Sequence, residues 1–69
     1  MIVLEGVWMK FSEVKKLLKN NGCRLDHEGA RHEMWYSPIT GLFFPVSRHN
    51  SEDCPTGTLN SILKSAGLK

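Results

Sequence analysis

The sequence predicts an α+β domain of two layers, with two helices on one face of a three-stranded antiparallel sheet, in the order α-β-β-β-α. Residues 12–21 and 57–66 have the apolar spacing of amphipathic helices, and three short segments rich in strand-forming residues lie between them. The turns between these segments are too short for the crossover that parallel strands need, so the strands should form a meander. A chain of 69 residues forms one such domain, which excludes a large enzyme with a separate cofactor domain.

The first predicted helix covers residues 12–21. Ser12 is a favourable N-cap, and Gly22 is suited to the left-handed backbone conformation that ends a helix. Lysines occupy the side of this helix that faces away from its apolar stripe. The stripe consists of Phe11, Val14 and Leu18.

The three strands are predicted over residues 23–27, 32–36 and 42–46. Apolar and polar residues alternate in the first strand, so Cys23 and Leu25 should face the core. Pro45 has no N–H group to donate to a neighbouring strand, so the third strand should lie at the edge of the sheet or end there.

The second predicted helix covers residues 57–66 and comes after a polar loop. Its N-cap should be Thr56 or Thr58, and Gly67 is placed to cap its C-terminus. The apolar residues of this helix recur at the spacing i, i+3, i+4 and i+7, which gives one stripe that faces the core. They are Leu59, Ile62, Leu63 and Ala66.

Residues 1–8 differ in character from the rest of the chain, and we expect them to be an N-terminal extension to a domain over residues 9–69. They are either an upstream extension before a start at Met9, or an extra strand or ordered arm. The segment is interrupted by Glu5 and Gly6 and has neither the basic region nor the cleavage site of a signal peptide. Nothing in the chain approaches the ~18 apolar residues of a membrane span. With two cysteines and no disulfide framework, the sequence predicts a cytoplasmic protein with reduced thiols.

The cysteines suggest two alternatives, a zinc site and a nucleophilic thiol, and the sequence disfavours both. A zinc site would combine Cys23 with His27, and His49 with Cys54. Strand geometry would place the first pair ~13 Å apart, too far for two ligands at ~2.0–2.3 Å from one metal. Cys54 is a poor nucleophile, because the acidic residues beside it raise the pKa of a thiol. We therefore expect no metal site, and we expect Cys23 to be a buried apolar thiol.

His32 is the candidate catalytic residue. It comes directly after the turn Gly29-Ala30-Arg31 and begins a strand, so solvent and substrate should reach its imidazole. Imidazole has an unperturbed pKa near ~6.5, which suits proton transfer at neutral pH. The alternative is that this histidine is a structural or surface residue without a chemical role.

The net charge is only +2, but several cations are grouped in the chain. A phosphate backbone that crosses the first helix and the turn before His32 would meet them, whereas the alternative is an ordinary solvated helix face. The candidate nucleic-acid-binding residues are Lys15, Lys16, Lys19, Arg31, Arg48, His49 and Lys64.

Four groups of residues together resemble a known family. They read SEVKKLL with NGC at 12–18 and 21–23, EGARHEMWYSP at 28–38, FPVSRH at 44–49 and GTLNSILKSAGL at 57–68. In this order and spacing, they resemble the HicA toxins, which are small mRNA interferases of bacterial toxin–antitoxin pairs. The resemblance covers about residues 9–68.

The resemblance implies a fold like that of a double-stranded-RNA-binding domain and an endoribonuclease that cuts mRNA without a metal or other cofactor. It also implies that His32 is the general acid or base, positioned by the turn at Gly29 and Ala30. The implied partner is a HicB-like antitoxin that masks this histidine, and we expect the free toxin to be a monomer that assembles further only with antitoxin. The alternative is a catalytically inactive module of the same fold that binds RNA or the antitoxin.

Two positions depart from the family in a way that bears on RNA binding. Thr56 and Asn60 stand where the family usually has basic residues at the last helix. This change removes positive charge where RNA would lie, and it favours the inactive-module alternative.

The antitoxin is expected to bind through aromatic residues near the catalytic histidine, because exposed aromatic residues commonly anchor interfaces. Neighbouring residues in a strand point to opposite faces, so Trp35 and Met34 differ in face, as do Phe43 and Phe44. The helices should therefore leave one pair of side chains uncovered, either Trp35 with Phe43 or Met34 with Phe44. We expect Trp35 and Phe43 to be exposed for this purpose. The alternative is that both belong to the core.

Overall fold

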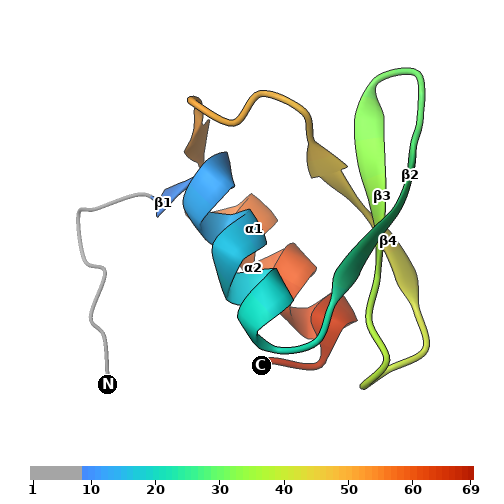
Figure 1. Cartoon of the computed structure of the whole chain (residues 1–69). Helices are drawn as coiled ribbons and strands as arrows, with labels where there is room; N and C mark the ends of the chain where they lie inside the picture. The colour runs from blue at the N-terminus through green and yellow to red at the C-terminus, as the bar shows by residue number, and fades with distance from the viewer. Residues whose placement is uncertain (1–8) are drawn as a thin grey trace.

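The computed structural model describes residues 9–69 and confirms the predicted α+β fold. Its elements in chain order are β1 (Met9–Lys10), α1 (Phe11–Asn20), β2 (Arg24–Glu28), β3 (His32–Tyr36), β4 (Phe43–Ser47), β5 (Asp53–Cys54) and α2 (Thr56–Ala66). The two helices lie side by side against one face of the sheet formed by β2, β3 and β4 (Figure 1). The predicted N-terminal extension, residues 1–8, falls outside the described residues.

The three-stranded sheet has the order β2-β3-β4, and both pairings are antiparallel, as the short connections predict. In the middle strand, Trp35 lies between Leu25 of β2 and Phe44 of β4. Pro45 lies in β4, which is an edge strand, so its missing N–H group costs the sheet no hydrogen bond to an outer neighbour.

Alternation along β3 assigns its side chains to the two faces of the sheet. Trp35 is buried, and Glu33 forms an ion pair with a lysine of α1, so both face the helices. His32, Met34 and Tyr36 occupy the alternate positions and therefore belong to the opposite, open face. The candidate catalytic residue thus lies at one end of the sheet, on the face that the helices leave free.

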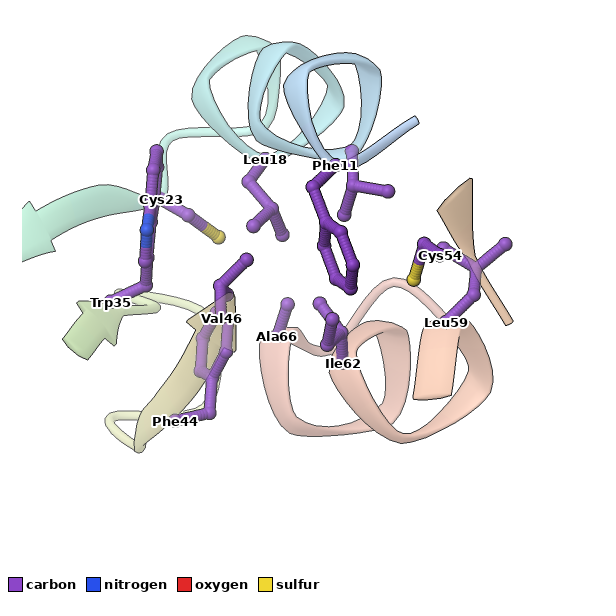
Figure 2. Packing of buried hydrophobic residues seen from close by; sticks show 11 residues of the cluster. Phe11, Leu18, Cys23, Trp35, Phe44, Val46, Cys54, Leu59, Ile62 and Ala66 are labelled. Atoms are coloured by element: carbon purple, nitrogen blue, oxygen red, sulfur yellow. The ribbon is translucent and has the colours of Figure 1, made fainter. Parts of the chain in front are cut away.

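The core fills the space between the helices and the sheet (Figure 2). Both predicted apolar stripes reach it, although Leu63 is only partly buried. Cys23 is buried as expected, and Leu25 lies opposite the core residue Trp35 and so shares its face, but Leu25 is 39% exposed and not buried in the core. β2 is an outer strand with all five residues exposed, because α2 packs against β4 at the other edge of the sheet.

A second, two-stranded sheet pairs β1 with β5 and was not predicted from the sequence. Met9 lies opposite Cys54, and Lys10 lies opposite Asp53, with an ion pair of 2.9 Å between Lys10 Nζ and Asp53 Oδ1. This short sheet joins the start of α1 to the start of α2, and it fixes the C-terminal end of the loop after β4.

The N-terminus of α1 differs from the prediction, because the helix begins at Phe11 and Lys10 is its N-cap. The expectation that Ser12 caps the helix is therefore wrong. The backbone N–H groups of Phe11 and Ser12 donate instead to the carbonyls of Glu52 (3.0 Å) and Asn50 (3.1 Å). These carbonyls satisfy the first two N–H groups of the helix in place of a cap from Ser12.

The ends of α2 agree with the prediction only at the C-terminus. The helix begins at Thr56 with Pro55 as N-cap, so neither predicted threonine caps it. Gly67 ends the helix with φ +82°, as expected, and a Cβ there would lie 2.6 Å from Ile39 Cγ2. No other residue fits this site, because both the backbone conformation and the close approach require glycine. Neither helix of the described chain is long and apolar enough to cross a membrane.

Candidate active site

The turn between β2 and β3 fixes the position of His32. The Gly29 N–H donates to the His32 carbonyl at 2.7 Å, which closes the turn. A Cβ on Gly29 would lie 3.0 Å from that same carbonyl oxygen, so this position favours a glycine. The imidazole is exposed at the start of β3, as predicted.

The loop after β4 lies beside this turn. His32 pairs across the sheet with Ser47, the last residue of β4. The Ser47 Oγ accepts a hydrogen bond of 3.1 Å from the backbone N–H of His49, and the His49 carbonyl accepts one of 3.1 Å from the Glu52 N–H. These bonds fold the loop back at the end of the sheet, so His49 lies near His32.

Arg48 bridges the same two segments. Its Nη1 donates to the Ala30 carbonyl at 3.3 Å, and its Nη2 lies 3.6 Å from Glu28 Oε1. Arg48 therefore has a structural role in holding the loop to the turn, although its side chain is still 46% exposed. Arg31 is exposed and has no carboxylate within ion-pair distance in the described part of the chain, so its guanidinium is available to a ligand.

These residues line a hollow of about 640 Å³ whose charged and titratable side chains are two guanidinium groups and two imidazoles. No carboxylate lines it, so the hollow suits an anionic ligand such as a phosphate group. The structure thus brings together five of the predicted site residues, and Ser47 is the sixth residue of the lining. The lining consists of Ala30, Arg31, His32, Ser47, Arg48 and His49.

Two further hollows lie beside α2 and differ in charge. One, of about 410 Å³, also includes His32, but it contains the carboxylates Glu52 and Asp53, which would repel a phosphate. The other, of about 570 Å³, lies between β4 and α2 and has no charged side chain in its lining. An anion is therefore best accommodated on the side of His32 that faces Arg31.

Lys15 does not belong to this surface, contrary to the expectation that it binds nucleic acid. Its side chain is buried, with the residue only 8% exposed, and its Nζ lies 3.0 Å from Glu33 Oε1. It also donates to the side-chain carbonyl of Asn50. Because a buried ammonium needs such partners, Lys15 is held inside the fold and is not available to an RNA backbone.

The network around Lys15 ties the two halves of the site to α1. Glu33 adjoins His32, and Asn50 adjoins His49, so one lysine holds both segments. Sequence reasoning missed Glu33 and Asn50. The available signal was that Glu33 alternates with His32 and shares a face with Trp35, and an acidic residue on a covered face requires a partner.

Glu33 has a pKa below its ordinary value. Burial raises this pKa, but hydrogen bonds from Lys15 and from Trp35 Nε1 (3.0 Å) lower it, as do the charges of Lys15 and Arg48. The lowering effects outweigh burial, so the carboxylate is ionised at neutral pH and pairs with the lysine.

The other predicted cations lie apart from the hollow. Lys16 and Lys19 are exposed on α1, and Lys64 is exposed on α2. None of the three lines the hollow at His32. They are therefore candidates only for the flanking parts of a long ligand.

The cysteines and His27 lie outside the site. Cys23 and Cys54 are buried free thiols, and burial raises the pKa of Cys54, so the cause is burial rather than the adjacent acids. His27 Nδ1 lies 2.7 Å from Asp26 Oδ2 on the exposed strand β2. Within residues 9–69, no three side chains of metal-ligating type are grouped together.

The open face of the sheet carries an aromatic pair, of which Phe43 is exposed and Tyr36 is partly buried. The rings of Tyr36 and Phe43 lie 5.0 Å apart, and the Arg24 guanidinium lies 4.9 Å from the centre of the Tyr36 ring. Phe43 is 55% exposed, whereas Trp35 is 1% exposed, so the expectation that Trp35 is available to a partner is wrong. The register pairs Trp35 with the buried Phe44, and it pairs Tyr36 with Phe43 on the free face.

Comparison with known proteins agrees with the resemblance seen in the sequence. A family model described as the HicA toxin of bacterial toxin–antitoxin systems matches residues 11–68, from the start of α1 to beyond the end of α2. No curated protein and no solved structure matches the chain.

Proposed function

The chain belongs to the HicA toxin family of bacterial toxin–antitoxin systems, and on this premise we propose that it is an endoribonuclease that cuts mRNA and thereby blocks translation. The observation that carries the proposal is the exposed imidazole of His32 in a hollow that also contains two guanidinium groups and no carboxylate. This arrangement combines a proton-transfer group with positive charge for a phosphate.

The proposed reaction uses the nucleophile that RNA itself carries. His32 takes the proton of the 2′-hydroxyl, the 2′-oxygen forms a bond to phosphorus, and the bond from phosphorus to the 5′-oxygen breaks as that oxygen takes up a proton. The products are a 2′,3′-cyclic phosphate and a 5′-hydroxyl. Arg31 stabilises the charge that develops on the phosphate oxygens. A positioned general base contributes a factor of ~10²–10⁴ to the rate, and the family resemblance implies that no metal is needed.

The proposed RNA surface extends from the hollow to the helices. Arg31, Arg48 and His49 contact the phosphate at the cleavage site, and the exposed lysines of α1 and α2 contact flanking phosphates. Lys15 is left out because it is buried.

The proposed partner is a HicB-like antitoxin that silences the toxin in the cytoplasm. His32 and the aromatic pair Tyr36 and Phe43 belong to the same open face of the sheet, ~13 Å apart along β3. A protein bound over the aromatic pair would therefore also cover the catalytic imidazole.

The alternative function is an inactive module of the same fold, which the uncharged Thr56 and Asn60 of α2 favour. Incubation of the purified protein with mRNA in excess EDTA separates the two. We expect cleavage products that carry a 2′,3′-cyclic phosphate. Intact mRNA at a protein concentration that saturates RNA binding would show that the inactive-module alternative is right.

A further inference from the structure

We propose that His49 is a second catalytic residue, the general acid that protonates the leaving 5′-oxygen while His32 deprotonates the 2′-hydroxyl. The inference rests on the proposed ribonuclease function and goes beyond the one catalytic histidine, His32, that the resemblance implies. The reaction balances without water or a co-reactant. One proton passes from the 2′-oxygen to His32, and another passes from His49 to the 5′-oxygen as its bond to phosphorus breaks.

The chemistry of RNA cleavage requires two proton transfers at opposite sides of one phosphorus atom. The attacking and leaving oxygens lie roughly in line, so a single imidazole cannot serve both at once. In this structure His32 and His49 line the same hollow, together with Arg31 and Arg48. At about 640 Å³ the hollow accommodates a phosphate with its neighbouring sugars, so both oxygens can be reached from within it.

The position of His49 is fixed by contacts that also fix His32. The His49 N–H donates to Ser47 Oγ at 3.1 Å, and Ser47 lies directly opposite His32 in the sheet. Arg48 holds the loop to the Ala30 carbonyl at 3.3 Å.

The buried Lys15 adds a link behind the hollow, because it contacts Glu33 and Asn50, the residues next in the chain after the two histidines. Both imidazoles are thus carried on backbone segments that are tied to each other and to α1. Such fixed spacing is what a reaction with a separate acid and base needs.

His27 provides a contrast within the same chain. It lies on β2, its ring contacts Asp26 at 2.7 Å, and it does not line the hollow. A role open to any exposed histidine would apply equally to His27 and His49. The proposed acid role applies only to His49, because only His49 lines the hollow.

The test compares two short RNAs that span a cleavage site mapped beforehand on mRNA. One is all-oxygen RNA, and the other has sulfur in place of the 5′-bridging oxygen at the scissile bond. A thiolate leaves without protonation, so the sulfur RNA needs a general base but no general acid. The variants are His49→Ala, His49→Gln, His32→Ala and the matched control His27→Ala, each checked by a thermal melt.

We expect both His49 variants to cleave the oxygen RNA ~10²–10⁴-fold more slowly than the wild type and to cleave the sulfur RNA at nearly the wild-type rate. His32→Ala should be slow on both RNAs, and His27→Ala should be unchanged on both. Equal losses of the His49 variants on the two RNAs, or wild-type rates on the oxygen RNA, would overturn the acid role. Failure of the ribonuclease function itself gives a different result, because the wild type would then cleave neither RNA.

Discussion

His32 lies exposed at the start of β3, so its side chain contributes little to the packing of the fold. The conversion of His32 to alanine should therefore change the free energy of unfolding by no more than ~0.5 kcal/mol. Loss of the proposed general base should slow mRNA cleavage by ~10²–10⁴-fold and abolish growth arrest on induction. His27→Ala is the matched control, because it removes an exposed imidazole outside the hollow.

Growth after induction, a thermal melt and cleavage by the purified variants check this prediction together. A folded His32→Ala protein that still arrests growth would refute the catalytic role of His32. If the variant loses its fold instead, His32 is a structural residue, which is the alternative interpretation of the sequence.

Glu33 makes the stability of the fold depend on pH at the acid end. A carboxyl whose pKa is lower in the folded than in the unfolded state stabilises the fold above the unfolded pKa, near ~4.3 for glutamate. This stabilisation is lost as the pH falls through the folded pKa. The free energy of unfolding of the wild type should therefore drop more steeply below pH ~4.3 than that of Glu33→Gln.

Urea unfolding at neutral pH and at a series of acid pH values measures the effect. Glu28→Gln is the control, because it removes a carboxylate whose side chain is 60% exposed. Parallel pH curves for the wild type and Glu33→Gln would contradict the ion pair with Lys15 as the source of the acid sensitivity.

The turn between β2 and β3 is the element that sets the position of the proposed base. In Gly29→Ala, the new Cβ would press on the His32 carbonyl at 3.0 Å and shift the start of β3 by a few tenths of an ångström. A shift of about 1 Å at a reacting group costs roughly 10²-fold in rate, so we expect a loss of about tenfold in cleavage.

Gly57→Ala is the matched control for this substitution, since a Cβ on Gly57 in α2 would have nothing within 4 Å. It should stabilise the fold by about 0.5–1 kcal/mol and leave cleavage unchanged. Cleavage rates and thermal melts of both variants give the answer. A Gly29→Ala enzyme as fast as Gly57→Ala would mean that the turn does not position His32.

The helices and the three-stranded sheet could be predicted because each is encoded by spacing within its own segment. The N-cap of α1 was mispredicted for a reason of longer range. The first N–H groups of α1 bond to carbonyls near residue 50, and no local pattern reveals that partner. The site combines local and long-range features in the same way. The turn before His32 could be predicted from the local sequence. The burial of Lys15 depends on Glu33 and Asn50, which only the fold brings to it.

Within residues 9–69, the helices cover one face of the three-stranded sheet and leave the other open (Figure 1), and the family membership implies a protein partner. The open face carries the contact between the rings of Tyr36 and Phe43, and Phe43 is exposed. Aromatic residues of this kind contribute strongly to interfaces when a partner buries them. The same face ends at His32, so one bound protein would both gain affinity from the aromatic pair and block the hollow.

Phe43→Ser should therefore weaken antitoxin binding by about tenfold or more. Leu25→Ser is the matched control, because Leu25 is 39% exposed but shares the helix-facing register of Trp35. Calorimetric titration of each purified variant with the cognate antitoxin measures the affinity, and growth after co-expression shows whether the toxin is silenced. We expect Phe43→Ser to arrest growth despite the antitoxin and Leu25→Ser to remain silenced. Equal affinities for the two variants would place the antitoxin elsewhere, and it would then have to silence the toxin without covering the open face.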